Sequence, residues 1–561
     1  MISCPNEPAG LWACGVMPPQ MTFTKIIPKG DGFYLYEYES YWEAKAGKAK
    51  QRFLRYLGPC DKAGNVLKPP KVQLEGLHSS FAVGRLIVFH ASAEQLRLRE
   101  RVRKVLGVDA EVAGHFVALV LNQATDRVAD EHLPDWVRAS PLPRLLSLDG
   151  EGLTPESFGR VRSALCHLSP AKIWEDRGLL LQEELTRAWR SQTREPPGAY
   201  YDVTKQAYHG WTNPYAQVGH DANGGTSMVV GFGMVVSEGH HHPYLCRALP
   251  GNQHDSLGVG ETVEMLRIRG YERLRLVMDR GMISKENVEL ARRKGYHLVG
   301  LVKGWDLETV ALASGWSERE LERPEHVVAT SRGSVYARAV TTPLFDLPRM
   351  RVAVVVNPRR KAEDREGRDL ALQELEGPVP KDRLAEIKQQ LRVQNPRLRK
   401  RRGYVPGLLV QSAGRRGFQL DPAAVERDRG LDGRFLIFST DLGLSGPEMY
   451  RTYFARDGIE KVFRTGKGEL CLGPVRHHRR DRLDAYATIF YTASLLWSWS
   501  EQTLQRKYPE MSLSEALGHL ENVAWVRFGT GKSIREWCTR LSGKADEILS
   551  ALGATRYLPV V

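Results

Sequence analysis

The alternation of strand-like and helical segments after Tyr200 is the feature that most constrains the fold. Short β-prone runs alternate with longer segments in which apolar residues recur at helical spacing. In chain order these are a strand at Tyr200–Thr204, a hairpin at 228–236 and 243–249, a helix at 255–270, a strand at 274–278, a helix at 284–294 and a strand at 296–303. Asp255 and Ser284 are the predicted N-caps of the two helices. This order predicts a mixed sheet with crossover helices, which is an α/β fold.

Other patterns flank and interrupt this α/β core. Two aromatic-rich runs around a glycine turn predict a basic β-hairpin near the amino terminus, and apolar residues at helical spacing predict helices at 94–104, 112–122 and 179–190. A strand at 433–440 resumes the core after a charge-dense segment. The predicted regions are a basic β-hairpin region at 1–91, a helical region with room for a DNA-binding motif at 92–195, the first part of the core at 196–303, a mixed α/β insertion at 304–432, the second part of the core at 433–500 and an appendage at 501–561.

Charge and composition limit the classes of partner. Lys plus Arg minus Asp plus Glu is 80 − 66 = +14, which favours a polyanion, and nucleic acid before membrane. The longest nearly apolar run, 485–499, is short for a bilayer and predicts a buried helix, and residues 1–20 do not read as a secretory signal. The seven scattered cysteines contain no C-x-x-C pair, which fits a reducing cytoplasm. The apolar run and the amino-terminal residues therefore predict no membrane partner, and the lack of a G-x-x-x-x-G-K-[ST] motif predicts no nucleotide cofactor.

Acidic residues stand at informative positions in the predicted core. Asp202 lies within the first strand and Asp279 directly follows a later one, where α/β folds place their sites. Taken singly, each is as well explained by a turn or an ion pair. Further along, Tyr453, Arg456, Glu460 and Lys467 would share one face of a continuous helix, within about 60° at 100° per residue. An exposed ladder of ion pairs explains that stripe equally well, and Gly466 is a candidate helix end.

Together these residues resemble a known family. The spacing Y-(2)-R-(3)-E-(6)-K, complete here, is similar to the signature of DDE transposases of bacterial insertion sequences in the group-four-like superfamily. Segments around the two aspartates and before the helix also resemble that family: Tyr201–Thr204, Pro250–Asp255, Asp279–Ser284 and Asp432–Phe438. The resemblance covers most of residues 30–500.

The resemblance implies both a fold and a reaction. It implies an RNase H-like catalytic core in which Asp202, Asp279 and Glu460 are the catalytic, metal-binding triad. Two Mg²⁺ or Mn²⁺ ions are the implied cofactors, since hard divalent ions prefer oxygen ligands. The implied activity is cleavage of double-stranded DNA at the terminal inverted repeats and joining of the 3′-OH ends to target DNA by a homodimer on paired ends. Tyr453, Arg456 and Lys467 would hold DNA phosphates.

Several alternatives stay open at this point. A basic cluster in the insertion contains Arg397, Arg399, Lys400, Arg401 and Arg402, and it is either a DNA-backbone contact or a solvated loop. The triad also suits an RNase H-like nuclease without strand transfer, and a catalytically silent DNA-binding remnant is a third reading. His240–His242 is interpreted as a polar turn rather than a zinc site.

Overall fold

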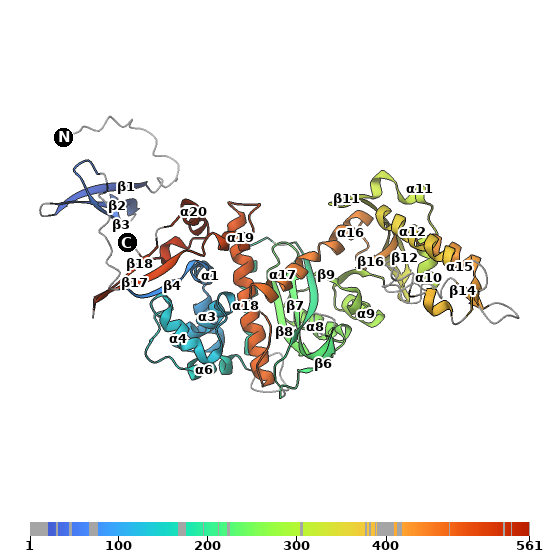
Figure 1. The fold of residues 1–561 in the computed structure, drawn as a ribbon, viewed down its shortest axis with the longest axis horizontal. Coiled ribbons are helices and arrows are strands. Elements are labelled where there is room, and N and C mark those ends of the chain that lie inside the picture. Colours follow the sequence, from blue (N-terminus) through green and yellow to red (C-terminus); the bar gives the residue numbers. More distant parts are fainter. Residues whose placement is uncertain are drawn as a thin grey trace. The chain divides into compact units, whose positions relative to one another are not determined.

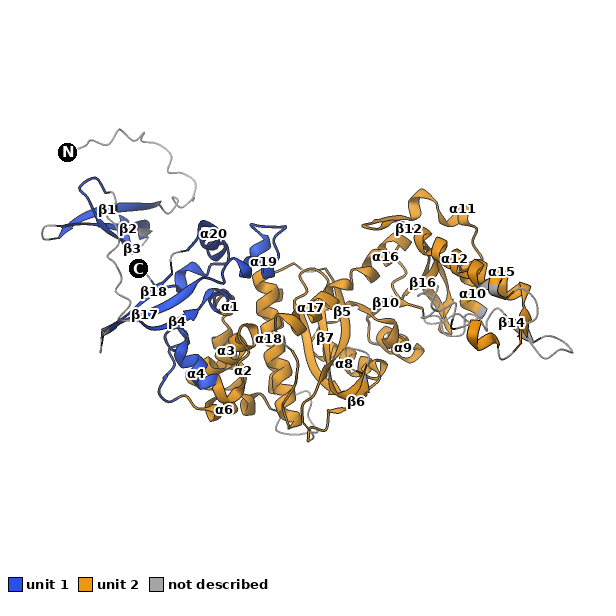
Figure 2. Cartoon of the chain, in the orientation of Figure 1, with its two compact units in different colours: residues 1–91, 133–152, 503–561 blue, residues 92–132, 153–502 orange. Residues whose placement is uncertain are grey.

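The computed structural model describes most of the chain in two compact units. It describes residues 21–29, 32–43, 48–64, 66, 77–166, 176–194, 196–210, 212–220, 225–302, 307–375, 379–380, 383–387, 389, 409–411, 418–470, 472–530, 533–539 and 541–559. Unit 1 comprises residues 1–91, 133–152 and 503–561, and unit 2 comprises 92–132 and 153–502 (Figure 2). Each unit is therefore assembled from separate stretches of the chain.

Unit 1 contains two small antiparallel sheets. The first has the order β1-β2-β3, with β1 at Met21–Lys29, β2 at Gly32–Glu43 and β3 at Lys48–Cys60. The predicted hairpin is confirmed as β2 and β3, whereas β1 was not predicted. Pro28 lies in β1, and proline is tolerated there because β1 is an edge strand. The second sheet has the order β18-β17-β4.

The remaining elements of unit 1 are short. The strands of its second sheet are β4 Leu77–Ala82, β17 Ala524–Thr530 and β18 Ser533–Cys538. Its helices are α1 Gly84–Gln95, which continues into unit 2, α4 Leu133–Ala139, α5 Leu142–Leu145, α19 Leu513–Gly518 and α20 Gly543–Ala551, with 3₁₀ turn η7 Thr555–Tyr557. Trp525 in β17 and Phe81 in β4 are paired neighbours, and Trp525 is buried in the core of this unit.

A helical part begins unit 2. Its helices are α2 Leu98–Leu106, α3 Ala110–Ala124, α6 Pro155–Leu165 and α7 Arg177–Arg190, and η2 spans Asp130–His132. The helices predicted at 112–122 and 179–190 are confirmed as parts of α3 and α7. The helix predicted at 94–104 is wrong as a single element, because Arg97 adopts a left-handed φ of 49° and the chain turns between α1 and α2.

One mixed sheet organises the rest of unit 2. Its strands are β5 Gly198–Ala207, β6 Gln217–His220, β7 Thr226–Ser237, β8 Pro243–Pro250, β9 Arg275–Met278, β10 His297–Leu301, β11 Val327–Thr330, β12 Gly333–Leu344, β13 Leu347–Val356 and β16 Arg434–Ser439. Their order is β11-β12-β13-β16-β10-β9-β5-β7-β6, and β8 also pairs with β7 (Figure 1). β5, β9 and β10 are parallel, and β7 runs antiparallel to β5. The predicted α/β core with a mixed sheet is therefore confirmed.

The crossover helices follow the prediction except at one start. α8 Val259–Ile268 and α9 Lys285–Arg293 connect the parallel strands, and Ser284 caps α9 by accepting a hydrogen bond from the Asn287 amide. Asp255 is not the N-cap of α8. It begins a separate 3₁₀ turn, η4 Asp255–Gly258, which His254 caps. A second 3₁₀ turn, η5 Arg280–Met282, follows β9.

Residues 304–432 supply strands to the same sheet. β13 pairs with β16 from Arg351 opposite Ser439 to Val356 opposite Arg434, and β16 pairs with β10 on its other side. The other described elements of this segment are α10 Leu307–Ser314, α11 Glu318–Leu321, η6 Pro324–His326, α12 Pro358–Glu374, α15 Pro422–Arg429 and the two-stranded sheet of β14 Leu409–Gln411 and β15 Phe418–Leu420.

Three helices complete unit 2: α16 Gly446–Phe454, α17 Asp457–Gly468 and α18 Arg480–Gln505. The predicted buried helix at 485–499 lies in α18, where Phe490, Leu495 and Leu496 are fully buried. Within the described ranges, no helix has the length and apolar character needed to cross a membrane.

Candidate active site

Two aspartates follow equivalent positions of adjacent parallel strands. In the register of β5 and β9, Tyr201 lies opposite Met278, so the next residues on the two strands are Asp202 and Asp279. Asp202 continues β5, whereas Asp279 leaves β9 and precedes η5. Parallel strands present their carboxyl ends at one edge of a sheet, which is where α/β proteins place their sites. The register therefore places the two side chains in one region.

The third predicted carboxylate, Glu460, comes from α17, which packs against β5. The continuous helix predicted through residues 453–467 is wrong. α16 ends at Phe454, Arg456 is the N-cap of α17, and Tyr453 belongs to the preceding helix. Gly466 does not end α17, which continues to Gly468.

Glu460 and Lys467 share one face within α17. They are seven residues apart, which is about 10 Å along the helix and about 20° short of two full turns. Both side chains are exposed, whereas the neighbouring Ile459 and Phe463 are buried. Lys467 therefore stands on the solvent face, beyond Glu460.

Arg456 lies among the three predicted carboxylates. One guanidinium nitrogen, Nη2, donates to Glu460 Oε1 at 3.0 Å and lies 3.4 Å from Asp279 Oδ1. The other, Nη1, lies 3.9 Å from Asp202 Oδ2. The Arg456 side chain is only 14% exposed, so its charge is held among these acids and is shielded from water. The structure thus gathers Asp202, Asp279 and Glu460 around one positive charge.

Burial perturbs the acid at the centre of this group. It raises the pKa of Asp202 to about 6, and the nearby Asp279 and Asp255 carboxylates add to the shift. A hydrogen bond from the Val203 amide, 2.9 Å from Asp202 Oδ1, and the Arg456 charge act against that rise in pKa. Burial therefore favours the protonated form of Asp202, and the Val203 hydrogen bond and the Arg456 charge favour its carboxylate.

The Tyr453 phenol is buried next to this group. Burial raises its pKa to about 12, and Arg456 lies 5.9 Å from the ring centre. Tyr453, near the end of α16, is only 5% exposed, and its ring lies beside the Arg456 side chain. It offers little surface to a ligand.

Two glycines let α17 approach its neighbours closely. A Cβ at Gly458 would overlap the imidazole of His241, and one at Gly466 would lie 2.8 Å from Phe490 of α18. His241 belongs to the turn between β7 and β8. The interpretation of His240–His242 as a polar turn is wrong for His242, which is fully buried and hydrogen-bonds Ser498 at 2.8 Å. The position of Glu460 therefore depends on the packing of this histidine turn.

The donor chemistry at this position suits a divalent metal ion. Three carboxylates facing one cation are the oxygen ligands that Mg²⁺ and Mn²⁺ prefer. As placed, however, no three acidic, histidine or cysteine side chains in the described part of the chain are arranged to hold a metal ion. Arg456 supplies the positive charge at this point instead. The three carboxylates are the kind of ligand that such an ion requires, and the Arg456 guanidinium lies between them.

The remaining predicted DNA contacts belong to the basic cluster of the predicted insertion. The basic cluster Arg397, Arg399, Lys400, Arg401 and Arg402 lies outside the described residues. Sequence reasoning missed Arg280, which directly follows Asp279 and is exposed. Its position beside a predicted metal ligand was the available signal.

The fold and the site define the class: a mixed α/β protein with one aspartate in a central strand, a second at the end of the adjacent parallel strand and a glutamate on a helix. A family model described as the transposase DDE domain matches residues 202–496, which is more than half of the chain. The chain therefore belongs to the DDE transposase family. No curated protein matches it. Among solved structures it is similar to piggyBac transposase in a cryo-EM synaptic complex with hairpin DNA, at 10% identity over 79% of this chain and 81% of that chain, with a TM-score of 0.36.

Proposed function

We propose that this chain is the transposase of a bacterial insertion sequence. It cleaves DNA at the element's terminal inverted repeats and joins the freed 3′-OH ends to target DNA, using one site for both phosphoryl transfers. It acts in the cytoplasm as a homodimer on paired ends. The observation that carries this proposal is the convergence of Asp202, Asp279 and Glu460 on the Arg456 guanidinium.

Strand order supports an RNase H-like core for this reaction. The central parallel strands β5, β9 and β10 are extended on one side by the antiparallel strands β7 and β8. Asp202 lies in one strand of this set and Asp279 directly follows the adjacent one, and α17 contributes Glu460. This is the arrangement that the family resemblance implies for a catalytic triad.

In this proposal Asp202, Asp279 and Glu460 hold two Mg²⁺ or Mn²⁺ ions. Such ions activate the attacking oxygen and stabilise the leaving oxygen of an in-line displacement. Burial of Asp202 excludes water from one side of the site, and its carboxylate stays oriented by the Val203 amide. Arg456 binds a phosphate oxygen of the DNA end, because the planar guanidinium group matches the geometry of a phosphate. Lys467, about two turns beyond Glu460 on the same face of α17, adds a second positive charge.

Single-residue variants test the assignment. Asp202→Asn, Asp279→Asn and Glu460→Gln should each abolish Mg²⁺-dependent cleavage of a terminal-repeat duplex and leave binding of that duplex largely intact. Glu366→Gln is the matched control, because Glu366 is an exposed carboxylate of α12 in the same unit. It should cleave like the unchanged protein.

A strand-transfer assay separates the remaining readings. A pre-cut end and a target plasmid should yield joined product with the unchanged protein. Cleavage without joining would identify a nuclease, and absence of both with intact DNA binding would identify a silent remnant. Full cleavage by any of the three carboxylate variants would refute the site assignment.

A further inference from the structure

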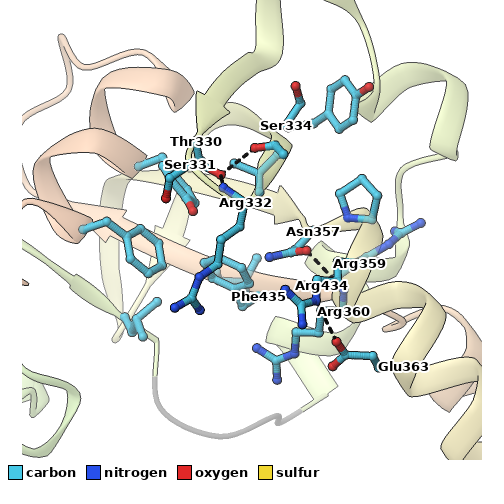
Figure 3. Close-up of a pocket in the computed structure, with 18 of the residues that line it drawn as sticks. Thr330, Ser331, Arg332, Ser334, Asn357, Arg359, Arg360, Glu363, Arg434 and Phe435 are labelled. Carbon is cyan, nitrogen blue, oxygen red and sulfur yellow. Dashed lines mark hydrogen bonds and ion pairs between the residues drawn. The ribbon is translucent and has the colours of Figure 1, made fainter.

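A large cavity in unit 2 opens next to the second aspartate. Its volume is about 1270 Å³, above the range of about 300–1,000 Å³ typical of small-molecule pockets. The turn between β11 and β12, the start of α12, one end of β16 and the last turn of α16 form its walls (Figure 3). Arg280, the neighbour of Asp279 in the chain, also lines it. The cavity is therefore large enough for a ligand bigger than an ordinary small molecule.

Arginines dominate the charge of this cavity. Five of them line it, Arg280, Arg332, Arg359, Arg360 and Arg434, against the two carboxylates of Glu363 and Asp457. The Arg332 side chain extends from the β11–β12 turn into the cavity (Figure 3). Within the described residues, the guanidinium groups of Arg280 and Arg332 have neither an ion pair nor a hydrogen bond.

The start of α12 adds to the positive field. Asn357 caps this helix by accepting a hydrogen bond from the Arg360 amide at 3.1 Å, and its first turn contains no acidic residue. The positive end of the helix dipole therefore lies at the cavity wall without a side-chain acid to offset it. The ion pairs of the arginines here are within the helix and weak: Arg359 with Glu363 at 3.1 Å and Arg360 with Asp364 at 3.8 Å.

Aromatic rings form a second wall. Phe435, Tyr450 and Phe454 all line the cavity. Phe454 packs against Tyr450 with ring centres 4.3 Å apart and against Phe435 at 6.1 Å. Phe454 also contacts Tyr453 at 5.3 Å, and it is nonetheless 37% exposed, which is unusual for a phenylalanine with three aromatic neighbours.

We propose that this cavity binds an unpaired segment of DNA strand adjoining the phosphate that the carboxylates act on. Basic groups that follow a backbone, combined with aromatic faces on which bases stack, are the recognition chemistry of single-stranded nucleic acid. A duplex keeps its base faces stacked inside the helix, so it would use the arginines and leave the aromatic wall uncovered. The inference rests on the proposed function, because it takes the strand at Asp279 to continue past Arg280 into the cavity.

Binding measurements with two DNAs test this proposal. The probes are a fluorescent terminal-repeat duplex with a short single-stranded extension and the same duplex with a blunt end, each titrated with full-length protein in EDTA over a range of salt. The test variant is Arg332→Ala/Arg360→Ala. The matched control is Arg319→Ala/Arg323→Ala, which removes two exposed arginines of unit 2 that do not line the cavity.

The extended duplex should separate these variants. We expect the test variant to bind it about tenfold more weakly, with a salt slope lower by about 1.4 because each lost single-strand phosphate contact contributes about 0.7. The control should bind both DNAs as the unchanged protein does. Phe454→Ala should also weaken binding of the extended duplex, by about tenfold, and leave the blunt duplex and the salt slope unchanged.

Two outcomes would overturn the inference while the proposed function stands. The first is that the unchanged protein cleaves terminal-repeat DNA, but Arg332→Ala/Arg360→Ala binds the extended duplex as tightly as the control variant does. The other is equal loss on the extended and blunt duplexes, which would assign the arginines to duplex DNA. If the unchanged protein neither binds nor cleaves terminal-repeat DNA, the proposed function fails, and the inference fails with it.

Discussion

The Arg456 guanidinium donates to Glu460 Oε1 at 3.0 Å, across one turn of helix from the start of α17. The same group lies 3.4 Å from Asp279 and 3.9 Å from Asp202. An arginine and a divalent metal ion compete for the same three carboxylates in this arrangement. The charge of the three carboxylates is therefore already neutralised in part by the protein itself.

Removing that arginine should strengthen metal binding. Arg456→Gln removes a charge that lies within 4 Å of all three acids and repels an incoming cation. We expect the DNA-free variant to bind Mn²⁺ about tenfold more tightly, measured by electron paramagnetic resonance titration. Arg451→Gln is the control, since Arg451 is an exposed arginine of α16. Equal or weaker Mn²⁺ binding by Arg456→Gln would show that the guanidinium does not compete with the ion.

A methyl group added at Gly458, where α17 approaches the turn between β7 and β8, should lower the unfolding free energy. In Gly458→Ala the new methyl group overlaps the His241 ring, so α17 must shift, and overpacking of this kind costs about 1–3 kcal/mol of unfolding free energy. Gly468→Ala on the same helix meets no atom within 4 Å and should be neutral or slightly stabilising. Urea denaturation measures both variants. His241→Ala should restore stability to Gly458→Ala, and a failure to do so would place the strain elsewhere.

A buried ion pair should be sensitive to loss of one partner. Arg368 of α12 binds both carboxylate oxygens of Asp432 at 2.5 and 2.7 Å, and the two side chains are 4% and 5% exposed. Arg368→Ala strands a buried carboxylate and should cost about 3–5 kcal/mol. Arg359→Ala, which breaks an exposed pair with Glu363, should cost less than about 1 kcal/mol.

The matched comparison for Arg368→Ala is a double variant that removes both charges of the pair. The double variant Arg368→Met/Asp432→Leu should recover much of the stability that Arg368→Ala loses, because the most deeply buried carboxylate is removed together with its partner. Tryptophan fluorescence during urea denaturation reports each midpoint. A double variant as unstable as Arg368→Ala would attribute the loss to packing rather than to charge.

Buried histidines should make the fold sensitive to acid. Burial lowers the pKa of His242 to about 3, whereas an unfolded imidazole titrates near 6.5. Below pH 6.5 the unfolded chain therefore binds a proton that the folded chain refuses, and the unfolding free energy falls by about 1.4 kcal/mol per pH unit for this residue. In His242→Gln the slope between pH 6 and 4 should shrink by about that amount.

The matched histidine for this measurement is His132, whose side chain is 67% exposed. His132→Gln should leave the slope of unfolding free energy against pH unchanged. An unchanged slope in His242→Gln would mean that its imidazole is protonated in the folded protein.

Local patterns predicted the core of the fold and two of its acids. Strand periodicity and turn residues are local signals, so the order of strands and helices from Tyr200 to Leu301 could be predicted, apart from the short strand β6. Asp202 and Asp279 stand beside strands in the sequence itself. The parallel pairing of β5 with β9, in the register that brings them together, is a tertiary contact that local patterns did not predict.

Tertiary packing decided what the sequence could not. A helical wheel assumes one straight helix, but α16 packs on β12, β13 and β16 while α17 packs on β5. These contacts lie on different parts of the sheet, so the helix breaks near Arg456 although no residue there forbids a helix. The arginine-lined cavity draws on segments around residues 280, 332 and 360, which are far apart in the chain and give no shared local signal.

The pairing of β16 with both β10 and β13 has a consequence for how this chain can change. Because hydrogen bonds run from β8 through β16 to β11, residues 304–432 cannot be excised as a module without leaving β16 as an uncovered edge strand. We therefore expect this part of unit 2 to unfold as one cooperative block. Natural variation in the segment is then confined to the ends and connections of its strands, where length can change without breaking a ladder.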